Sequence, residues 1–161
     1  MRDVLEQKVL DDLEELGADF EAFEIDPAFA DTAAFCEKYG YALEESANAI
    51  LIASKRPDGQ FCLCLALATT RLDVNHKVRS LMEVRKLSFA QGEQTVAVTG
   101  MEIGGVTPFG LDTPPSIYVD SAVVSLDRVI VGGGTRGMKV RVDPEVFARM
   151  DGVQVIAGLA G

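Results

Sequence analysis

The sequence of 161 residues contains no tryptophan, one histidine and three cysteines. So few cysteines, odd in number, argue against a disulfide-stapled secreted scaffold, and we expect Cys36, Cys62 and Cys64 to pack as small hydrophobic side chains. The lone histidine leaves any metal site short of ligands, so we expect no metal. The longest apolar runs, such as Phe61 to Ala68, are too short for a bilayer span of about 20 residues. The N-terminus lacks a signal-peptide pattern, and we expect a soluble, cytoplasmic protein with no membrane contact.

Several catalytic and cofactor-binding signatures are also missing. The chain has no Gly-x-Ser-x-Gly nucleophile elbow, no Gly-Lys-Ser/Thr phosphate loop and no dinucleotide fingerprint. Nothing supports a nucleophilic Cys–His pair, since His76 stands among charged residues of an expected helix. The sequence therefore indicates no cofactor and no side-chain nucleophile.

Acidic residues are concentrated at the N-terminal end. The formal net charge is −10, and residues 1–31 carry −9 of it, from 11 acids and 2 bases. Such a chain is unsuited to tight nonspecific binding of nucleic acid, and we expect no DNA partner. A local excess of bases lies between Arg71 and Lys86 and includes Lys77 and Arg79, which are candidates for contact with a nucleic-acid end. A solvated helix face is the alternative interpretation.

The hydrophobic pattern predicts an α+β domain spanning residues 1–161. Residues 1–18 read as an acidic amphipathic helix closed by Gly17. Apolar segments at 48–54 and 61–68 flank the turn signal Arg56-Pro57-Asp58-Gly59 and predict a β-hairpin. We further expect helices at 33–39, 73–82, 93–99 and 144–150, and strands at 20–25, 86–89, 116–119, 128–131, 138–142 and 153–156. Helices and strands mix without regular βαβ units, which favours a mixed or mostly antiparallel sheet.

Two glycine-rich loops are the candidates for chemistry. The segment from Gly104 to Gly110 reads Gly-Gly-Val-Thr-Pro-Phe-Gly, in which glycines permit close backbone approach and Pro108 fixes the path. Such a loop can direct backbone N–H groups at a carbonyl or phosphate oxygen, as in an oxyanion hole. The segment from Gly132 to Gly137 can form an anion-binding nest. An ordinary turn is the alternative at both places.

These loops belong to a longer series of motifs along residues 20–158. In order and spacing the series resembles the YbaK/prolyl-tRNA editing family of aminoacyl-tRNA deacylases, and the two glycine loops together are its most specific part. The matching segments are Asp31-Thr32-Ala33, the hairpin from Asn48 to Ala68, Arg71-Leu72-Asp73, Lys86-Leu87-Ser88-Phe89, Thr99 to Gly110, Ile117-Tyr118-Val119-Asp120 and Val131 to Gly137.

The resemblance implies a mixed, barrel-like β-sheet flanked by helices, with one pocket and no metal or cofactor. It implies hydrolysis of the ester that joins a wrong amino acid to the 3′ end of a tRNA. An activated ester needs a positioned water and backbone donors rather than a nucleophilic side chain. The implied ester-positioning and catalytic residues are Gly104, Gly105, Thr107 and Pro108. The implied substrate-binding residues are Asn48, Asp120, Gly132, Gly133 and Gly134, and the tRNA-binding residues expected from the basic segment are Arg71, Lys77 and Arg79.

Asn48 departs from the family pattern. Family members commonly carry a lysine here, in a pattern like Lys-Thr-Leu, where this chain has Ala47-Asn48-Ala49-Ile50-Leu51. Asparagine keeps hydrogen-bonding capacity but loses the charge, and losing a charged partner costs about 1.5–3 kcal/mol per hydrogen bond. Asn48 therefore marks either a different amino-acid specificity or a protein that binds without hydrolysing.

Three functions follow from these observations. The leading hypothesis is a free-standing, trans-editing deacylase of mischarged tRNA, of the prolyl-tRNA type. The alternative is a non-catalytic module that binds aminoacyl-tRNA, an amino acid or an RNA end, and Asn48 is its main support. The third is hydrolysis of a small-molecule ester in the same pocket, which would not need the basic segment from Arg71 to Lys86.

Overall fold

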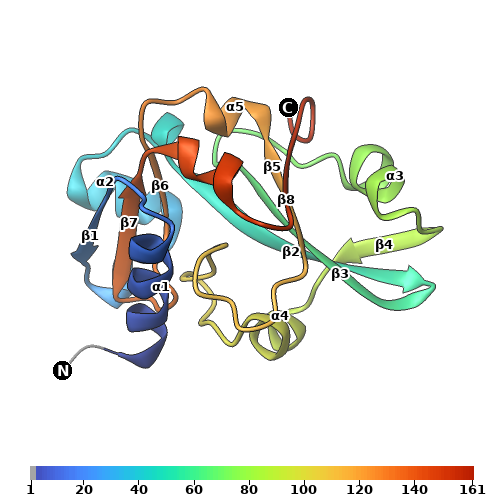
Figure 1. Cartoon of the computed structure of the whole chain (residues 1–161), viewed down its shortest axis with the longest axis horizontal. Coiled ribbons are helices and arrows are strands. Elements are labelled where there is room, and N and C mark those ends of the chain that lie inside the picture. The colour runs from blue at the N-terminus through green and yellow to red at the C-terminus, as the bar shows by residue number, and fades with distance from the viewer. Residues whose placement is uncertain (1–2) are drawn as a thin grey trace.

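The computed structural model describes residues 3–161, which form two β-sheets and the helices packed on them (Figure 1). One sheet has five strands in the order β4-β2-β3-β5-β8, and the other has three in the order β1-β7-β6. The strands are β1 (Phe20–Glu24), β2 (Ala47–Arg56), β3 (Asp58–Leu67), β4 (Lys86–Phe89), β5 (Ser116–Asp120), β6 (Val129–Gly132), β7 (Met138–Val142) and β8 (Val153–Ile156).

The long hairpin of β2 and β3 is the centre of the larger sheet. Its register runs from Ala47 opposite Leu67 to Lys55 opposite Asp58, and Gly59 adopts a positive φ of 94° after the turn. Strand β4 is antiparallel to β2, whereas β5 is parallel to β3 and β8 is parallel to β5. The predicted hairpin and mixed sheet are therefore confirmed.

The smaller sheet lies beside the start of β2. Both of its pairings, β1 with β7 and β6 with β7, are antiparallel. A single bridge between Ser46 and Ile130 connects it to the chain entering β2. Within residues 3–161 the two sheets do not close into a barrel, because this one bridge is all that joins their edges. The predicted α+β class is confirmed, and the barrel-like sheet that the resemblance implied is an open arrangement of two sheets.

The helices of the structure are α1 (Val4–Glu15), α2 (Thr32–Tyr39), α3 (Arg79–Met82), α4 (Gly92–Thr99) and α5 (Ser121–Val124). Asp3 caps α1 by accepting a hydrogen bond from the backbone N–H of Leu5. Gly40 and Gly100 end α2 and α4 in the left-handed conformation, as expected of C-terminal glycines. No helix in the described residues is long and apolar enough to cross a membrane.

Two predicted helices take other forms. Residues 73–82 begin with a π-helical turn, η3 (Val74–Val78), in which the N–H of Val78 bonds to the carbonyl of Asp73, and only then continue as α3. This wider turn buries both Val74 and Val78 against β2 and β3. The segment Pro144–Arg149 is a 3₁₀-helix rather than an α-helix. Sequence periodicity does not distinguish these forms, because tertiary packing selects among them.

The main core fills the space between the two sheets and α1. Val9 and Leu13 of α1 are fully buried there, and the rings of Phe109 and Phe147 stack with centroids 5.6 Å apart. A second cluster between the larger sheet and η3 contains Cys62 and Cys64, whose sulfurs are 3.8 Å apart. Their hydrogen bond raises the pKa of the Cys64 thiol, so this cysteine stays protonated. The predicted packing of these cysteines as small hydrophobic side chains is confirmed.

Candidate functional site

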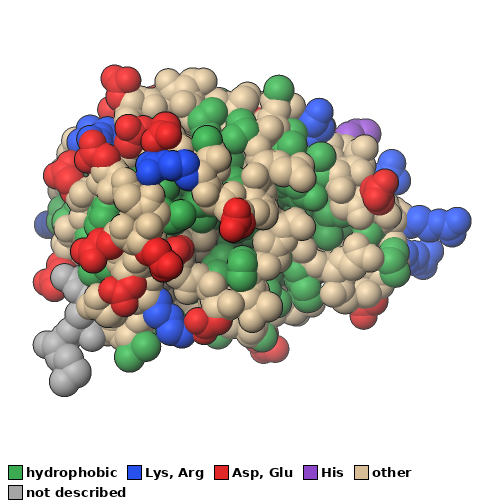
Figure 2. Space-filling view, in the orientation of Figure 1, with side chains coloured by type: hydrophobic (Ala, Val, Ile, Leu, Met, Phe, Trp, Pro, Cys, Tyr) green, Lys and Arg blue, Asp and Glu red, His purple; other side chains and the backbone are tan. Residues whose placement is uncertain are grey.

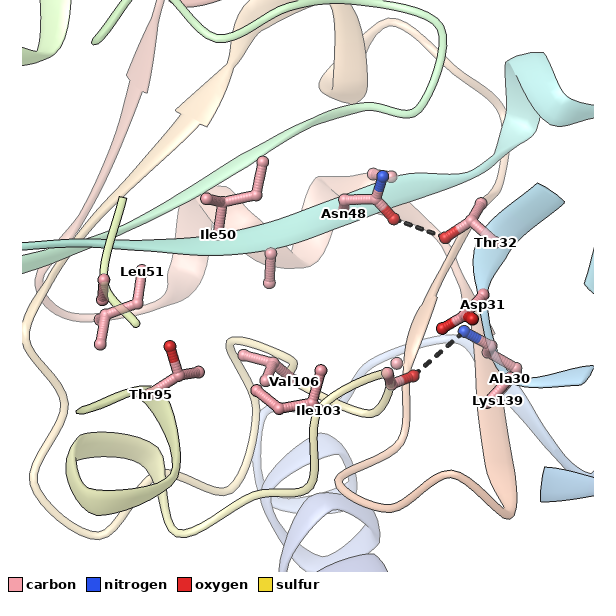
Figure 3. A pocket seen from close by; sticks show the side chains of 15 residues that line it. Ala30, Asp31, Thr32, Asn48, Ile50, Leu51, Thr95, Ile103, Val106 and Lys139 are labelled. Atoms are coloured by element: carbon pink, nitrogen blue, oxygen red, sulfur yellow. Dashed lines mark hydrogen bonds between the residues drawn. The ribbon is translucent and has the colours of Figure 1, made fainter. Parts of the chain in front are cut away.

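A cavity of about 400 Å³ opens between β2, the start of α2, α4 and both glycine-rich loops (Figure 3). We call it the loop pocket. Its polar side chains come from separate parts of the chain, and its remaining wall is mostly alanine and branched aliphatic residues. The lining residues are Ala30, Asp31, Thr32, Ala47, Asn48, Ala49, Ile50, Leu51, Ala90, Thr95, Ile103, Gly104, Val106, Gly132 and Lys139.

Asn48 lies in the loop pocket and is oriented by α2. The hydroxyl of Thr32 donates a hydrogen bond of 2.6 Å to Asn48 Oδ1, as Figure 3 shows. No hydrogen bond among residues 3–161 uses the amide nitrogen of Asn48, so this donor is free for a ligand. Thr32 is the first residue of α2, after the N-cap residue Asp31. The predicted substrate contact therefore has a fixed carboxamide at the pocket wall.

Lys139 of β7 is a pocket residue that the sequence analysis missed. Its side chain is buried, and its Nζ lies 3.5 Å from the carbonyl oxygen of Gly104 and 5.5 Å from the centroid of the Phe35 ring. Burial lowers the pKa of Lys139, while Cys36 and Asp31 act in the opposite direction. No sequence pattern indicates it, because the alternation of Met138, Lys139 and Val140 predicts an outward-facing lysine. The tertiary structure buries Lys139 as well and places it opposite Gly132 in the β6–β7 register.

The first glycine loop contributes Gly104 and Val106 to the pocket. Gly105 faces away, toward the second loop, and its N–H donates a hydrogen bond of 2.9 Å to the carbonyl of Glu102. Thr107 is fully buried and does not line the cavity, and Pro108 lines a separate cavity of about 290 Å³ near α1. The structure thus brings only Gly104, of the four predicted ester-positioning residues, to the wall of the loop pocket.

The second glycine loop packs backbone to backbone against the first. The N–H of Gly134 donates a 2.7 Å hydrogen bond to the carbonyl of Gly105, and the carbonyl of Gly134 accepts one of 3.1 Å from Glu102. A Cβ at Gly132 would lie 2.6 Å from the carbonyl oxygen of Val106. Of the predicted residues in this loop, Gly132 lines the pocket, whereas Gly133 and Gly134 are not among the lining residues.

Arg136 connects this loop assembly to α2. Its guanidinium donates hydrogen bonds to the carbonyls of Pro27 (3.2 Å) and Ile103 (3.1 Å) and lies 3.3 Å from Asp31 Oδ1. The Arg136 N–H also donates to Glu102 Oε1. The side chain therefore links the first glycine loop to the residues before α2 and is not a free, solvent-facing cation.

Asp120 is buried at the end of β5 and does not line the loop pocket. Its Oδ1 accepts a 3.1 Å hydrogen bond from the N–H of Leu159, which anchors the C-terminal segment. This contact accounts for the buried carboxylate in the present structure. Its predicted contribution to the polarity of the pocket remains a prediction.

Buried Thr107 has an unusual side chain, since its hydroxyl has no hydrogen-bond partner within residues 3–161. An unsatisfied buried polar group costs about 1–3 kcal/mol. We expect Thr107→Val, which keeps the shape, to raise the free energy of unfolding by about 1 kcal/mol in urea titration. Thr99→Val is the matched control and should be destabilising, because the Thr99 hydroxyl bonds to Thr95 and Met101. A loss of stability in Thr107→Val would indicate an unseen partner of this hydroxyl.

A second cavity of about 600 Å³, the outer groove, lies next to the loop pocket. Ile50 lines both cavities, so they are neighbours across β2. The side chain of Phe89 in the outer groove is 58% exposed, which is unusual for a phenylalanine. Arg71 and His76 also line it. Of the predicted tRNA-binding residues, Arg71 is therefore at a groove, whereas Lys77 and Arg79 lie beside it on η3 and α3.

Basic residues gather at this end of the molecule. Figure 2 shows acidic side chains over the α1 end and Lys and Arg side chains at the opposite end, near α3, β4 and the hairpin. None of the ion pairs within residues 3–161 involves the bases here. We call this set the basic surface; its members are Lys55, Arg56, Arg71, Lys77, Arg79, Arg85 and Lys86.

The described residues contain no group of three or more His, Cys, Asp or Glu side chains placed to hold a metal ion. His76 is exposed and lies 3.3 Å from Asp73, whereas all three cysteines are buried. The chemistry of the loop pocket thus depends on an amide, hydroxyls, backbone groups and one buried ammonium.

Comparison with known proteins supplies the context for this pocket. Residues 26–150 match the model of the aminoacyl-tRNA editing domain. The chain is 30% identical over 128 residues to the uncharacterized protein YwhH of Bacillus subtilis, covering 79% of this chain and 77% of that protein. It is 32% identical over 77 residues to a proline–tRNA ligase of Bacillus licheniformis, covering 48% of this chain but only 13% of the ligase.

Solved structures agree on the fold. A protein described as a candidate trans-editing enzyme for prolyl tRNA synthetase superposes with a TM-score of 0.80 at 24% identity, covering 98% of each chain. A hypothetical protein of known structure superposes with a TM-score of 0.85 at 20% identity, covering 96% of this chain and 99% of its own. The family match covers most of the chain, including both glycine loops and Asn48. The chain therefore belongs to the aminoacyl-tRNA editing domain family.

Proposed function

We propose that this protein is a trans-acting deacylase that hydrolyses the ester of a mischarged tRNA, of the prolyl-tRNA type. The observation that carries the proposal is the convergence of Asn48, Gly104 and Gly132 on one cavity, although these residues come from three distant segments. The family match and the fold of a candidate trans-editing enzyme support the same function.

The reaction needs one water molecule and no cofactor. The water oxygen bonds to the ester carbonyl carbon, and the carbonyl electron pair moves onto its oxygen to form an oxyanion. Collapse of this intermediate breaks the bond between the carbonyl carbon and the ribose oxygen. One water proton goes to that ribose oxygen, which leaves a free amino acid and a tRNA with its hydroxyl restored. The protein accelerates the step by orienting the ester and stabilising the oxyanion.

The loop pocket suits the aminoacyl end of this substrate. Its β2 wall is apolar, with Ala49 and Leu51, and Ala30, which precedes α2, also lines the cavity, so it favours a small aliphatic side chain. Asn48 offers its free amide N–H groups to the aminoacyl group, and Gly104 lets the substrate approach the loop backbone. In this proposal Gly105, Gly133 and Gly134 act indirectly, by holding the two loops together.

The outer groove suits the terminal nucleotides. A tRNA ester must place its amino acid and its terminal adenosine in adjoining sites, and Ile50 borders both cavities. The exposed ring of Phe89 can stack on a base, and Arg71 can contact a phosphate. The basic surface then extends along the direction in which the acceptor stem would continue. This arrangement favours a tRNA over a small-molecule ester.

The test is a deacylation assay in which purified protein is incubated with tRNAs that carry correct or incorrect small amino acids, and the release of each amino acid is measured. We expect release of one mischarged amino acid well above the rate without protein, and little release from the correctly charged tRNA. Asn48→Ala should lower turnover about 10-fold or more, since it removes a polar contact to the bound substrate. Saturable binding of charged tRNA with no release would instead support the binding-module hypothesis, which the missing lysine at position 48 favours.

A further inference from the structure

Lys139 stands apart from every other base in the described chain. Within residues 3–161 it is the only Lys or Arg side chain that is buried, with 6% of its surface exposed. Burying an ammonium is unfavourable unless it is well paired. The hydrogen bond that it donates to the Gly104 carbonyl spans 3.5 Å, which is the outer limit for such a bond. The group therefore retains donor capacity at the wall of the loop pocket.

The neighbours of Lys139 do not neutralise it. The carboxylate of Asp31 is exposed and pairs instead with Arg136, at 3.3 Å. No ion pair within residues 3–161 includes Lys139. The ring of Phe35 lies on one side of the ammonium, and Cys36 belongs to the same helix, α2. Lys139 also lines the loop pocket, where it donates its hydrogen bond to the Gly104 carbonyl, and Figure 3 shows it beside Asp31.

We propose that Lys139 supplies the cation of the substrate site, and that its ammonium binds the carbonyl oxygen of the aminoacyl ester. The charge that the family pattern places on β2, at position 48, is supplied here from β7, in the same cavity. This inference rests on the function proposed above. It assigns a residue that the glycine-loop motifs do not contain.

The chemistry requires no proton transfer to or from Lys139. Its N–H groups donate hydrogen bonds to the ester carbonyl oxygen, and these bonds strengthen as negative charge develops there. The weak bond to Gly104 is easily exchanged for one to the substrate. Gly104 has a φ of 93°, and this backbone conformation brings its carbonyl beside the ammonium. The same loop thus positions both the lysine and the ester.

The decisive experiment compares turnover of the mischarged tRNA by wild type, Lys139→Met, Asn48→Lys and the double variant Asn48→Lys/Lys139→Met. We expect Lys139→Met to lower kcat about 10- to 100-fold with a smaller change in KM, because the contact strengthens in the transition state. The double variant should regain about 10-fold or more over Lys139→Met, since it returns a cation to the same cavity. Asn48→Lys alone should gain little, since wild type already holds a cation there. If Lys139 were merely structural, Asn48→Lys alone would gain as much over wild type as the double variant gains over Lys139→Met.

Two controls separate catalysis from folding. Lys38 also lies over a phenylalanine ring, at 5.1 Å from the Phe29 centroid, but it does not line the loop pocket. Lys38→Met should therefore keep wild-type turnover. Lys139→Met should unfold at the same temperature as wild type or higher, since it removes a buried charge.

The pH profile gives an independent readout. Burial lowers the pKa of Lys139, with Arg136 acting in the same direction and Asp31 and Cys36 opposing it. Only the protonated form can donate as an ammonium, so the advantage of wild type over Lys139→Met should shrink as the pH rises through this pKa. A constant ratio across that range would contradict an ammonium role.

The outcomes distinguish this inference from the proposed function. No turnover by wild type on any charged tRNA would overturn both. Turnover by wild type that Lys139→Met fully retains, or a double variant no faster than Lys139→Met, would overturn the Lys139 assignment alone. An aminoacyl ester of adenosine without phosphates completes the test. Equal losses on it and on tRNA support the carbonyl contact, whereas a loss confined to tRNA would assign Lys139 to a phosphate and overturn that contact.

Discussion

Gly105→Ala is expected to lower the free energy of unfolding by about 3 kcal/mol, the upper part of the range for overpacking. A Cβ at this position would lie 2.3 Å from the carbonyl oxygen of Thr135 and 2.7 Å from its nitrogen. Both are backbone atoms of the second glycine loop, so no side-chain rotation can relieve the contact. The loops would have to separate, which also breaks the 2.7 Å hydrogen bond from Gly134 to Gly105.

The measurement is urea unfolding of the purified variant followed by circular dichroism. Gly92→Ala is the matched control. Gly92 also has a negative φ, but a Cβ there meets only a side-chain atom of Ile103 at 4.0 Å. We expect this change at the start of α4 to be neutral or slightly stabilising. Wild-type stability in Gly105→Ala would mean that the two loops do not touch in solution.

This prediction changes how a loss of activity at Gly105 is interpreted. The Gly105 N–H already donates to Glu102, so a substitution would act first on the loop packing. Separation of the loops would also move Gly104 and Gly132 away from the pocket wall. Activity should therefore fall together with stability, and a variant that folds normally but is inactive would restore a direct role for Gly105 in holding the ester.

Charge reversal on the basic surface should discriminate a tRNA substrate from a small ester. We expect Lys77→Glu/Arg79→Glu to lower kcat/KM toward charged tRNA roughly 30-fold at low salt. Each change replaces an attraction to phosphate by a repulsion, at a total cost of about 1 kcal/mol per position. Neither residue pairs with an acid within residues 3–161, so the fold loses no ion pair. Hydrolysis of an aminoacyl-adenosine ester should remain within about twofold of wild type.

The control for net charge is Lys8→Glu/Lys38→Glu, which alters the charge equally on α1 and α2, outside the basic surface. Because the Lys8 change also breaks the 2.7 Å ion pair with Asp112, the free energy of unfolding of this control is measured alongside its turnover. The control should affect tRNA turnover far less, and its remaining effect should vanish at high salt. An unchanged rate in Lys77→Glu/Arg79→Glu would indicate that the tRNA binds to another face of the protein. An equal loss on both substrates would indicate damage to the site rather than to tRNA contact.

Local patterns predicted most of the elements. The alternation and turn signal of the hairpin, the glycines at 40 and 100, and the acidic amphipathic first helix all correspond to structure over nearly the expected residues. They succeed because hydrophobic period, capping and turn chemistry are set by neighbours in sequence. The predicted helix type was less accurate where tertiary packing determines the form of the helix, as in the π-helical turn at Val74–Val78.

The candidate site was predicted in part. Asn48, Gly104 and Gly132 were named from sequence, and all three line the loop pocket. Thr107, Pro108 and Asp120 were named with them, yet the structure places their side chains in the core or at another cavity. The position of a glycine in a motif does not show whether it lines the pocket or packs against the other loop. Neighbouring glycines differ only in the direction that the backbone takes at each of them.

The sequence by itself determined the α+β elements, the two glycine loops and the absence of a lysine at position 48. Only the tertiary structure decided that Lys139 and Asn48 line one cavity. That meeting depends on Gly132 pairing with Lys139 in the β6–β7 register and on the loops packing through Gly105 and Gly134. These are contacts between segments far apart in the chain, and hydrophobic periodicity records which face of a strand is buried but not which distant segment covers it.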